Sequence, residues 1–231
     1  MAAAALRVAF VDSGCAPRHQ NCVAAAAAFV LDDRGVRRIE AAPDALGHGS
    51  RVADILLHCA PRIELLVAQV FRERLGTTPL QVAAAIDWAV ECGAGLINLS
   101  LGLREPRPVL AAACARARAA GVVLCAAAPA RGPAVYPAGF AGVLRVTGDA
   151  RCAPSEIAAL GAEHADFGSH VRPLDGTPLP GAGASMACAW LSGLAARHLA
   201  AAGSADQLHA WLRAQARHHG ADNPGSRTHE Q

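Results

Sequence analysis

The chain contains no lysine, so all 21 of its Lys and Arg positions are arginines. The formal net charge is only +2, and the arginines are interspersed with aspartates and glutamates. A protein that binds a polyanion usually concentrates basic side chains in one run or on one surface. The sequence therefore predicts no nucleic-acid partner.

Long apolar runs are also missing, although 53% of the residues are hydrophobic. No stretch reaches the roughly 18 apolar residues that a membrane span needs, so no membrane partner is expected. The alanine run at residues 2–5 is too short for a secretory signal and has no basic start. It leads through Leu6 and Arg7 into an apolar segment, and the expected location is cytoplasmic.

The eight cysteines include no Cys-x-x-Cys pair, and none clusters with histidine at the spacing of a metal site. Most lie inside apolar segments, where a reduced cysteine packs as a small core side chain. We expect reduced and mostly buried thiols, with disulfides or a metal site as the alternative. Neither a cofactor nor a metal ion is predicted.

Aromatic residues are scarce at 4%, whereas alanine makes up about a quarter of the chain and far exceeds its usual share. Packing should therefore rely on small side chains and on the close approach of helices. A chain of 231 residues is long enough for one domain with a sizeable core. We expect a single domain over residues 1–216 and a disordered polar tail at residues 217–231.

Segments with strand-like and helix-like patterns alternate along the chain. Strands are expected at residues 7–11, 23–31, 63–71, 95–99, 122–127 and 143–147. Helices are expected at residues 49–60, 79–92, 108–120, 186–201 and 208–212, a loop or hairpin at 32–44, and a loop-rich passage at 150–181. This alternation favours an α/β fold with a parallel sheet covered on both faces. In such a sheet the functional groups lie at the carboxyl ends of the strands.

Three short segments place an acid, a base and a nucleophile on turns beside regular elements. Asp12 ends a strand in the sequence Val-Asp-Ser-Gly, His48 lies between two glycines before a helix, and Ser185 begins a helix after small residues. Singly, these residues are explained as a turn former, a loop residue and a helix cap. Together they are the three groups of a Ser-His-Asp hydrolase.

The segments between the histidine and the serine extend this pattern. Residues 95–102 read Gly-Leu-Ile-Asn-Leu-Ser-Leu-Gly, residues 122–128 read Val-Val-Leu-Cys-Ala-Ala-Ala, and residues 136–138 read Tyr-Pro-Ala. With the order Asp, His, Ser along the chain, residues 6–202 resemble the subtilisin-like serine protease family. The resemblance implies a three-layer αβα fold with a mostly parallel sheet, and endopeptidase activity. Asp12 would be the orienting acid, His48 the general base and acid, and Ser185 the nucleophile.

The resemblance also implies a peptide-binding segment and a pocket for the residue before the scissile bond. The residues that would form them are Ser100, Leu101, Gly102, Ala126, Ala127 and Ala128. The first three would pair with an extended peptide through their main chain. The small size of the alanines implies a small or apolar side chain in the pocket.

The oxyanion hole departs from the family pattern. The family usually ends the alanine strand in Gly-Asn, whose amide stabilises the oxyanion, but Ala128 and Pro129 stand there. The threonine that usually precedes the nucleophile is Ala184. The backbone N–H of Ser185 is one remaining donor, and a second would have to come from Arg131 or from another backbone amide. In subtilisin, loss of the asparagine lowers kcat by about 10²–10³-fold.

Three functions are compatible with these residues. The first is a serine endopeptidase that cleaves a dedicated peptide or leader segment through an acyl-enzyme, and it is the function we expect. The second is a catalytically degenerate module that binds or chaperones a peptide, and the third is acyl transfer to an amine. The small chain and the altered oxyanion segment are similar to the family's compact maturases of modified peptides, in particular the one in quinohemoprotein amine dehydrogenase biogenesis. The implied partner is therefore a modified peptide with a leader.

Overall fold

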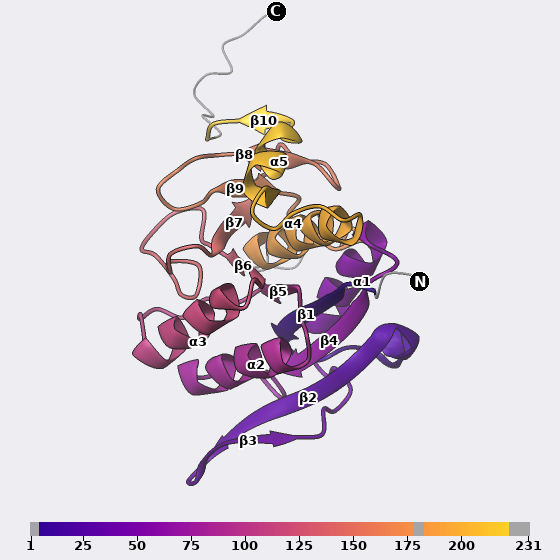
Figure 1. Cartoon of the computed structure of the whole chain (residues 1–231), viewed down its shortest axis with the longest axis vertical. Coiled ribbons are helices and arrows are strands. Elements are labelled where there is room, and N and C mark those ends of the chain that lie inside the picture. Colours follow the sequence, from indigo (N-terminus) through magenta and orange to yellow (C-terminus); the bar gives the residue numbers. More distant parts are fainter. Residues whose placement is uncertain (1–4, 178–182, 222–231) are drawn as a thin grey trace, which may run out of the picture.

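Figure 1 shows a computed structural model of the chain, which describes residues 5–177 and 183–221. In this part of the chain, one ten-stranded sheet has the order β10-β8-β9-β7-β6-β5-β1-β4-β2-β3. The strands are β1 (Arg7–Asp12), β2 (Val23–Asp32), β3 (Gly35–Ile39), β4 (Glu64–Gln69), β5 (Leu96–Leu99), β6 (Val123–Ala127), β7 (Leu144–Gly148), β8 (Ile157–Ala159), β9 (Phe167–Ser169) and β10 (His218–His219). The helices are α1 (His48–Cys59), α2 (Pro79–Glu91), α3 (Pro108–Ala119), α4 (Gly183–Ala200) and α5 (Leu208–Ala214), with a 3-10 helix η1 at Pro17–Cys22.

Most neighbouring strands run parallel. Strand β1 lies between β4 and β5, and β6 lies between β5 and β7, all in parallel register. The antiparallel pairs are β2 with β3 and β8 with β9. The predicted α/β fold with a mostly parallel sheet is confirmed. Residues 32–44, predicted as a loop or hairpin, contain the turn after β2, strand β3 and the loop that follows it.

Helices cover both faces of the sheet, which gives the three layers visible in Figure 1. Residues Val8 and Phe10 of β1 belong to the core beneath α1 and α4, whereas Ala9 and Val11 belong to the core beneath α2 and α3. All four side chains are fully buried. A strand buried on both faces is continuously apolar, which is why residues 8–11 carry no polar side chain.

Helix α2 begins at the predicted capping box. The hydroxyl of Thr78 accepts a hydrogen bond from the backbone N–H of Gln81, and Pro79 occupies the first helical position. The side chain of Gln81 also donates to the backbone oxygen of Phe29 at 2.8 Å, so the cap ties α2 to β2. Alanines are poor strand formers by themselves, but four of the five alanines of β2, Ala25 to Ala28, are held extended because they pair with β4.

The passage at residues 150–181 was predicted to be rich in loops, and it also contains two short strands that the sequence did not predict. It contains β8 and β9, each three residues long, which pair with each other and join β7 at the edge of the sheet. Three residues are too few to show the alternation that identifies a strand. Residues 178–181 of this passage lie outside the described residues.

Residues 217–221 were predicted to belong to a disordered tail, but residues 217–220 pair with the sheet. Strand β10 pairs in parallel with β8, and the backbone N–H of Arg217 donates to the oxygen of Ile157 at 2.8 Å. The N–H of Gly220 donates to the oxygen of Ala159 at 2.9 Å. The fold therefore includes residues 217–221, and residues 222–231 lie outside the described residues. Within residues 5–177 and 183–221, no helix has both the length and the apolarity of a membrane span.

Candidate active site

The carboxyl ends of the central strands lie together at one edge of the sheet. Asp12 is the last residue of β1, and Ser100 follows β5, its neighbour in the sheet. His48 is the first residue of α1, and Ser185 lies in the first turn of α4. A cavity of about 350 Å³ opens among these elements and is lined by His48, Ser185 and residues 100–103. The fold thus brings the predicted base and nucleophile to one cavity.

Asp12 and His48 form a buried hydrogen-bonded pair. Nδ1 of His48 lies 2.7 Å from Oδ1 and 3.0 Å from Oδ2 of Asp12, whose side chain is 0% exposed. An ionised carboxylate only accepts hydrogen bonds, so this contact assigns the proton to Nδ1. In the neutral ring, Nε2 is then left as a proton acceptor.

The surroundings of His48 act on its pKa in opposite directions. Burial of the ring lowers the pKa, because it disfavours the charged imidazolium. The charge of Asp12 and the hydrogen bond to it raise the pKa, as does the charge of Asp44, whereas Arg51 lowers it. The net result is a pKa above the ordinary value of histidine, so the site stabilises the protonated form that a general base must pass through.

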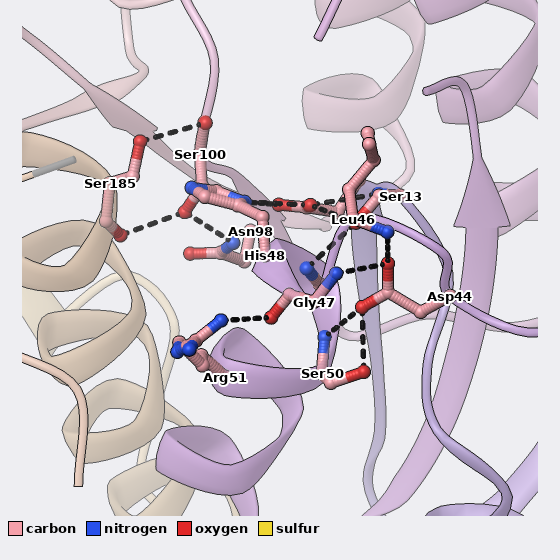
Figure 2. A network of polar contacts seen from close by, with 12 residues as sticks. Ser13, Asp44, Leu46, Gly47, His48, Ser50, Arg51, Asn98, Ser100 and Ser185 are labelled. Atoms are coloured by element: carbon pink, nitrogen blue, oxygen red, sulfur yellow. Dashed lines mark hydrogen bonds and ion pairs between the residues drawn. The ribbon is translucent and has the colours of Figure 1, made fainter. Parts of the chain in front are cut away.

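Ser185 and Ser100 exchange two hydrogen bonds, as Figure 2 shows. The hydroxyl of Ser185 donates to the backbone oxygen of Ser100 at 3.0 Å, and the hydroxyl of Ser100 donates to the backbone oxygen of Ser185 at 2.9 Å. Among the described residues, the ring of His48 is hydrogen-bonded to Asp12 alone. The acid–base pair and the serine hydroxyl are therefore separate units here, and catalytic hydrogen bonds often tighten only around a substrate.

Ser185 is the third residue of α4, which places its backbone N–H among the first four of the helix. These N–H groups have no partner within a helix, and the positive end of the helix dipole favours a negative charge there. Pro129 and Arg131, in contrast, line a second cavity of about 430 Å³. The side chain of Arg131 forms no hydrogen bond or ion pair with the described part of the chain.

The predicted pocket walls are divided between the two cavities. Residues 100–102 line the first cavity and Ala128 lines the second. Ala126 and Ala127 are buried in β6 and line neither cavity. Val135 lies at the boundary of the two cavities. It lines the second cavity and packs against Gly102 of the first, where an added Cβ atom would lie 2.9 Å from its Cγ2.

A sequence profile of the subtilase family matches residues 4–228. The chain belongs to the subtilase family. A segment of 108 residues is 37% identical to the subtilisin-like protease het-Q2 of Podospora anserina and covers 41% of this chain and 29% of that protein. Subtilisin DY of Bacillus licheniformis is 28% identical over 175 residues, which are 68% of this chain and 62% of that protein. The matches thus span less than two thirds of these relatives.

Solved structures resemble this subtilase over almost its whole length. The S41 psychrophilic protease superposes with a TM-score of 0.68 at 20% identity and covers 95% of this chain and 88% of its own. The prenylagaramide maturation protease PagA superposes with a TM-score of 0.65 at 20% identity and covers 97% of this chain and 87% of its own. A lanthipeptide protease gives 0.64 at 18% identity, over 90% and 79% of the two chains. These likenesses establish the subtilisin-like fold.

One wall of the first cavity in this subtilase was not predicted. Phe71 and Leu75, from the segment between β4 and α2, line the cavity together with Leu101 and Leu103. Leu75 is 63% exposed, which is unusual for a large apolar side chain. An exposed leucine cannot be recognised from sequence unless its surroundings are known.

Four polar residues that support the predicted triad were also missed. Asn98 donates to the hydroxyl of Ser100 at 2.9 Å and accepts from Ser192 at 2.9 Å. Ser13 accepts from the backbone N–H of Gly49 at 2.9 Å, and Asp44 bonds to the start of α1. Only Asp44 had a local signal, since acidic residues are favoured beside a helix N-terminus.

All eight cysteines of this subtilase are unpaired, and five of them are buried. Burial raises the pKa of Cys125 to about 12 and that of Cys188 well above its ordinary value, so both stay protonated. They pack as small core residues. Among the described residues, no group of three or more His, Cys, Asp or Glu side chains is placed to hold a metal ion.

Proposed function

We propose that this subtilase is a serine endopeptidase that cleaves a dedicated peptide or leader segment through an acyl-enzyme. The proposal is carried by one observation: a hydrogen-bonded Asp12–His48 pair and the hydroxyl-bearing Ser185 meet at one cavity. Family membership supports the same activity.

In this proposal Ser185 is the nucleophile, His48 the general base and acid, and Asp12 the orienting acid. The hydroxyl of Ser185 leaves the Ser100 oxygen, and Nε2 of His48 takes its proton as Oγ attacks the scissile carbonyl carbon. His48 then protonates the leaving amine, and the acyl-enzyme forms. Water, activated by the same imidazole, releases the new carboxyl end and restores Ser185.

The main chain beside Ser185 supports peptide binding. Backbone N–H and C=O groups of Leu101 and Gly102 have no hydrogen-bond partner in the described part of the chain. Such a free edge can pair with an extended peptide, as the sequence predicted. The apolar wall of Phe71 and Leu75 would contact apolar side chains of that peptide.

The oxyanion site supports slow turnover on a dedicated substrate. We propose the backbone N–H of Ser185 as one donor, while Pro129 has neither an N–H nor a polar side chain to provide the other. Arg131 lines the second cavity and not the first, so its geometry does not favour it as a replacement. Binding energy from a long, specific peptide would then contribute to positioning the bond.

Likeness to PagA and to the lanthipeptide protease supports a substrate of the modified-peptide class, since their names describe the maturation of prenylagaramide and a lanthipeptide. The narrower resemblance to the maturase of quinohemoprotein amine dehydrogenase biogenesis and the cytoplasmic location stay predictions. The resting hydrogen bond of Ser185 to Ser100 is the observation that favours the alternative, a peptide-binding module without turnover.

Labelling with a biotinylated fluorophosphonate and digestion of a peptide library separate these functions. We expect labelling and cleavage by the native chain, loss of both in Ser185→Ala, and no change in Ser204→Ala, which alters an exposed serine outside the cavity. Peptide binding that is unaffected by Ser185→Ala, without labelling or cleavage, would establish the binding module instead. Incorporation of added glycinamide into the product would establish acyl transfer.

A further inference from the structure

The start of helix α1 is held by a carboxylate that the triad does not include. Oδ1 of Asp44 accepts hydrogen bonds from the backbone N–H groups of Leu46 at 3.0 Å and Gly47 at 2.8 Å. Oδ2 accepts from the backbone N–H of Ser50 at 2.8 Å and from its hydroxyl at 2.6 Å. Figure 2 shows Asp44 to the right of Gly47 and Ser50, beside the first turn of the helix. One side chain thus binds both sides of the residue that carries the imidazole.

The backbone at His48 has little freedom as a result. Gly47 has a φ of +74°, a left-handed conformation that glycine adopts without strain, and its N–H is bonded to Asp44. On the other side, the N–H of Gly49 donates to Ser13, whose own N–H donates to Asp12 at 2.8 Å. The orientation of the His48 ring toward Asp12 therefore depends on a clamp at each neighbour.

Asp44 is also the second negative charge that acts on the ring. Burial of Asp44 raises its pKa, but the Ser50 hydroxyl and the backbone N–H groups outweigh burial, so the pKa stays below its ordinary value and the group is ionised at neutral pH. Two negative charges act on His48, Asp12 from β1 and Asp44 from the loop before α1. One positive charge, Arg51 from α1, acts on it in the opposite direction. The facing segments contribute the uncharged Ser100 and Ser185.

We propose that Asp44 is a positioning residue of this site, which fixes the first turn of α1 and thereby the imidazole of His48, and which supplies a second negative charge to the imidazolium. The role rests on the proposed function as far as catalysis is concerned. The role can also be tested without a substrate, because the charge of Asp44 acts on the His48 ring whether or not a peptide is bound.

Nuclear magnetic resonance titration of His48 tests the charge directly. We compare the native chain with Asp44→Asn and with the matched control Asp54→Asn, and assign the His48 signal by its absence in His48→Gln. Asp54 lies on α1, as His48 does, but it pairs with Arg18 and His19, so its replacement makes the same change in net charge away from the site. The pKa of His48 should fall in Asp44→Asn and stay unchanged in Asp54→Asn. An unchanged pKa in Asp44→Asn, or an equal fall in both variants, would overturn the proposal.

Kinetics test the positioning. Because Asp44 does not line the cavity, Asp44→Asn should lower kcat by up to about 100-fold with little change in KM, as expected for a misplaced catalytic group. The acid limb of the kcat/KM profile should also move to lower pH, since the base loses its proton more readily without Asp44. A native kcat in Asp44→Asn would contradict the role.

A second variant covers the case in which Asp44→Asn does not fold. Ser50→Ala deletes the 2.6 Å hydrogen bond and keeps the charge, so kcat should fall while the acid limb stays in place. An unchanged kcat in Ser50→Ala would then overturn the positioning role. If the native chain is not labelled at Ser185 and cleaves no peptide, the proposed function fails, and the titration of His48 still decides the role of Asp44.

Discussion

At the scale of single residues, the position of Ser185 is determined by a buried chain of polar side chains. Ser192 donates to Asn98, Asn98 donates to the hydroxyl of Ser100, and that hydroxyl donates to the backbone oxygen of Ser185. Asn98 and Ser192 are fully buried. Buried polar groups are stabilising only when each has a partner, and here the partners join β5 to both the first and the third turn of α4.

Ser192→Ala should therefore destabilise the protein although it removes only one hydroxyl. The change leaves Oδ1 of Asn98 buried without its partner, which costs about 1–3 kcal/mol. Chemical denaturation, monitored by the fluorescence of the three tryptophans, measures the change in the free energy of unfolding. Ser204→Ala, at an exposed serine, should stay within about 0.5 kcal/mol of the native chain. Equal stability of the two variants would show that the chain of hydrogen bonds contributes nothing.

The sequence predicts candidate residues that stand in a local motif, and it does not predict those that depend on distant partners. Asp12, His48 and Ser185 each have a recognisable neighbourhood of small residues, so their meeting at one site could be expected. Asn98 and Ser192 are 94 positions apart. Their contact exists only because α4 packs against β5, and no local pattern of an asparagine or a serine records that.

At the scale of elements, the boundary between the two cavities depends on a contact between the segment that follows β5 and the segment that follows β6. Leu103 and Tyr136 exchange backbone hydrogen bonds of 2.7 and 2.8 Å, which holds Val135 against Gly102. The isopropyl group of Val135 thereby lies between Gly102 and the cavity that Ala128 lines. The resemblance to subtilisins led us to expect a small pocket beside β6, and we expect Val135, which lines the same cavity as Ala128, to limit it.

Val135→Ala should broaden the preference for the residue before the scissile bond. Removal of two methyl groups opens the division between the two cavities, so kcat/KM for peptides with Leu or Phe at that position should rise, by about 10–200-fold for a pocket change of this size. Peptides with Ala there should be cleaved as before. The matched control is Val36→Ala, a half-buried valine in the edge strand β3. Unchanged selectivity in Val135→Ala would show that this side chain does not bound the pocket.

The central elements were predictable because each is long enough to show its own pattern, and the edge of the sheet was not. Residues 8–11 of β1 are continuously apolar and α2 begins with a capping box, so both appear in the sequence as they do in the structure. Strands β8, β9 and β10 have two or three residues each. Such strands are specified by the partner strand and not by their own composition, as context decides strand formation.

At the scale of the whole molecule, the C-terminal segment completes the edge of the sheet far from the site. Strand β10 occupies the outer position next to β8, at the opposite end of the sheet from β3. The guanidinium of Arg151 forms an ion pair with Asp149 and donates to the backbone oxygen of Gly220 at 2.8 Å. The polar composition of residues 217–221 indicated a tail, but backbone pairing does not depend on apolar side chains.

A chain that ends after Ala216 should consequently be less stable than one that ends after Ala221. The shorter chain loses the hydrogen bonds of Arg217 and Gly220 to β8 and that of Arg151 to Gly220. At about 0.5–1.5 kcal/mol for each of these three hydrogen bonds, the difference in unfolding free energy should be about 1.5–4.5 kcal/mol. Because both chains lack residues 222–231, their comparison isolates β10.

Fluorophosphonate labelling of Ser185 is the control. It should proceed equally in both chains below their melting temperatures, since β10 is an outer strand and the cavity lies at the carboxyl ends of the central strands. Equal melting temperatures would instead mean that β8 is held by β9 alone.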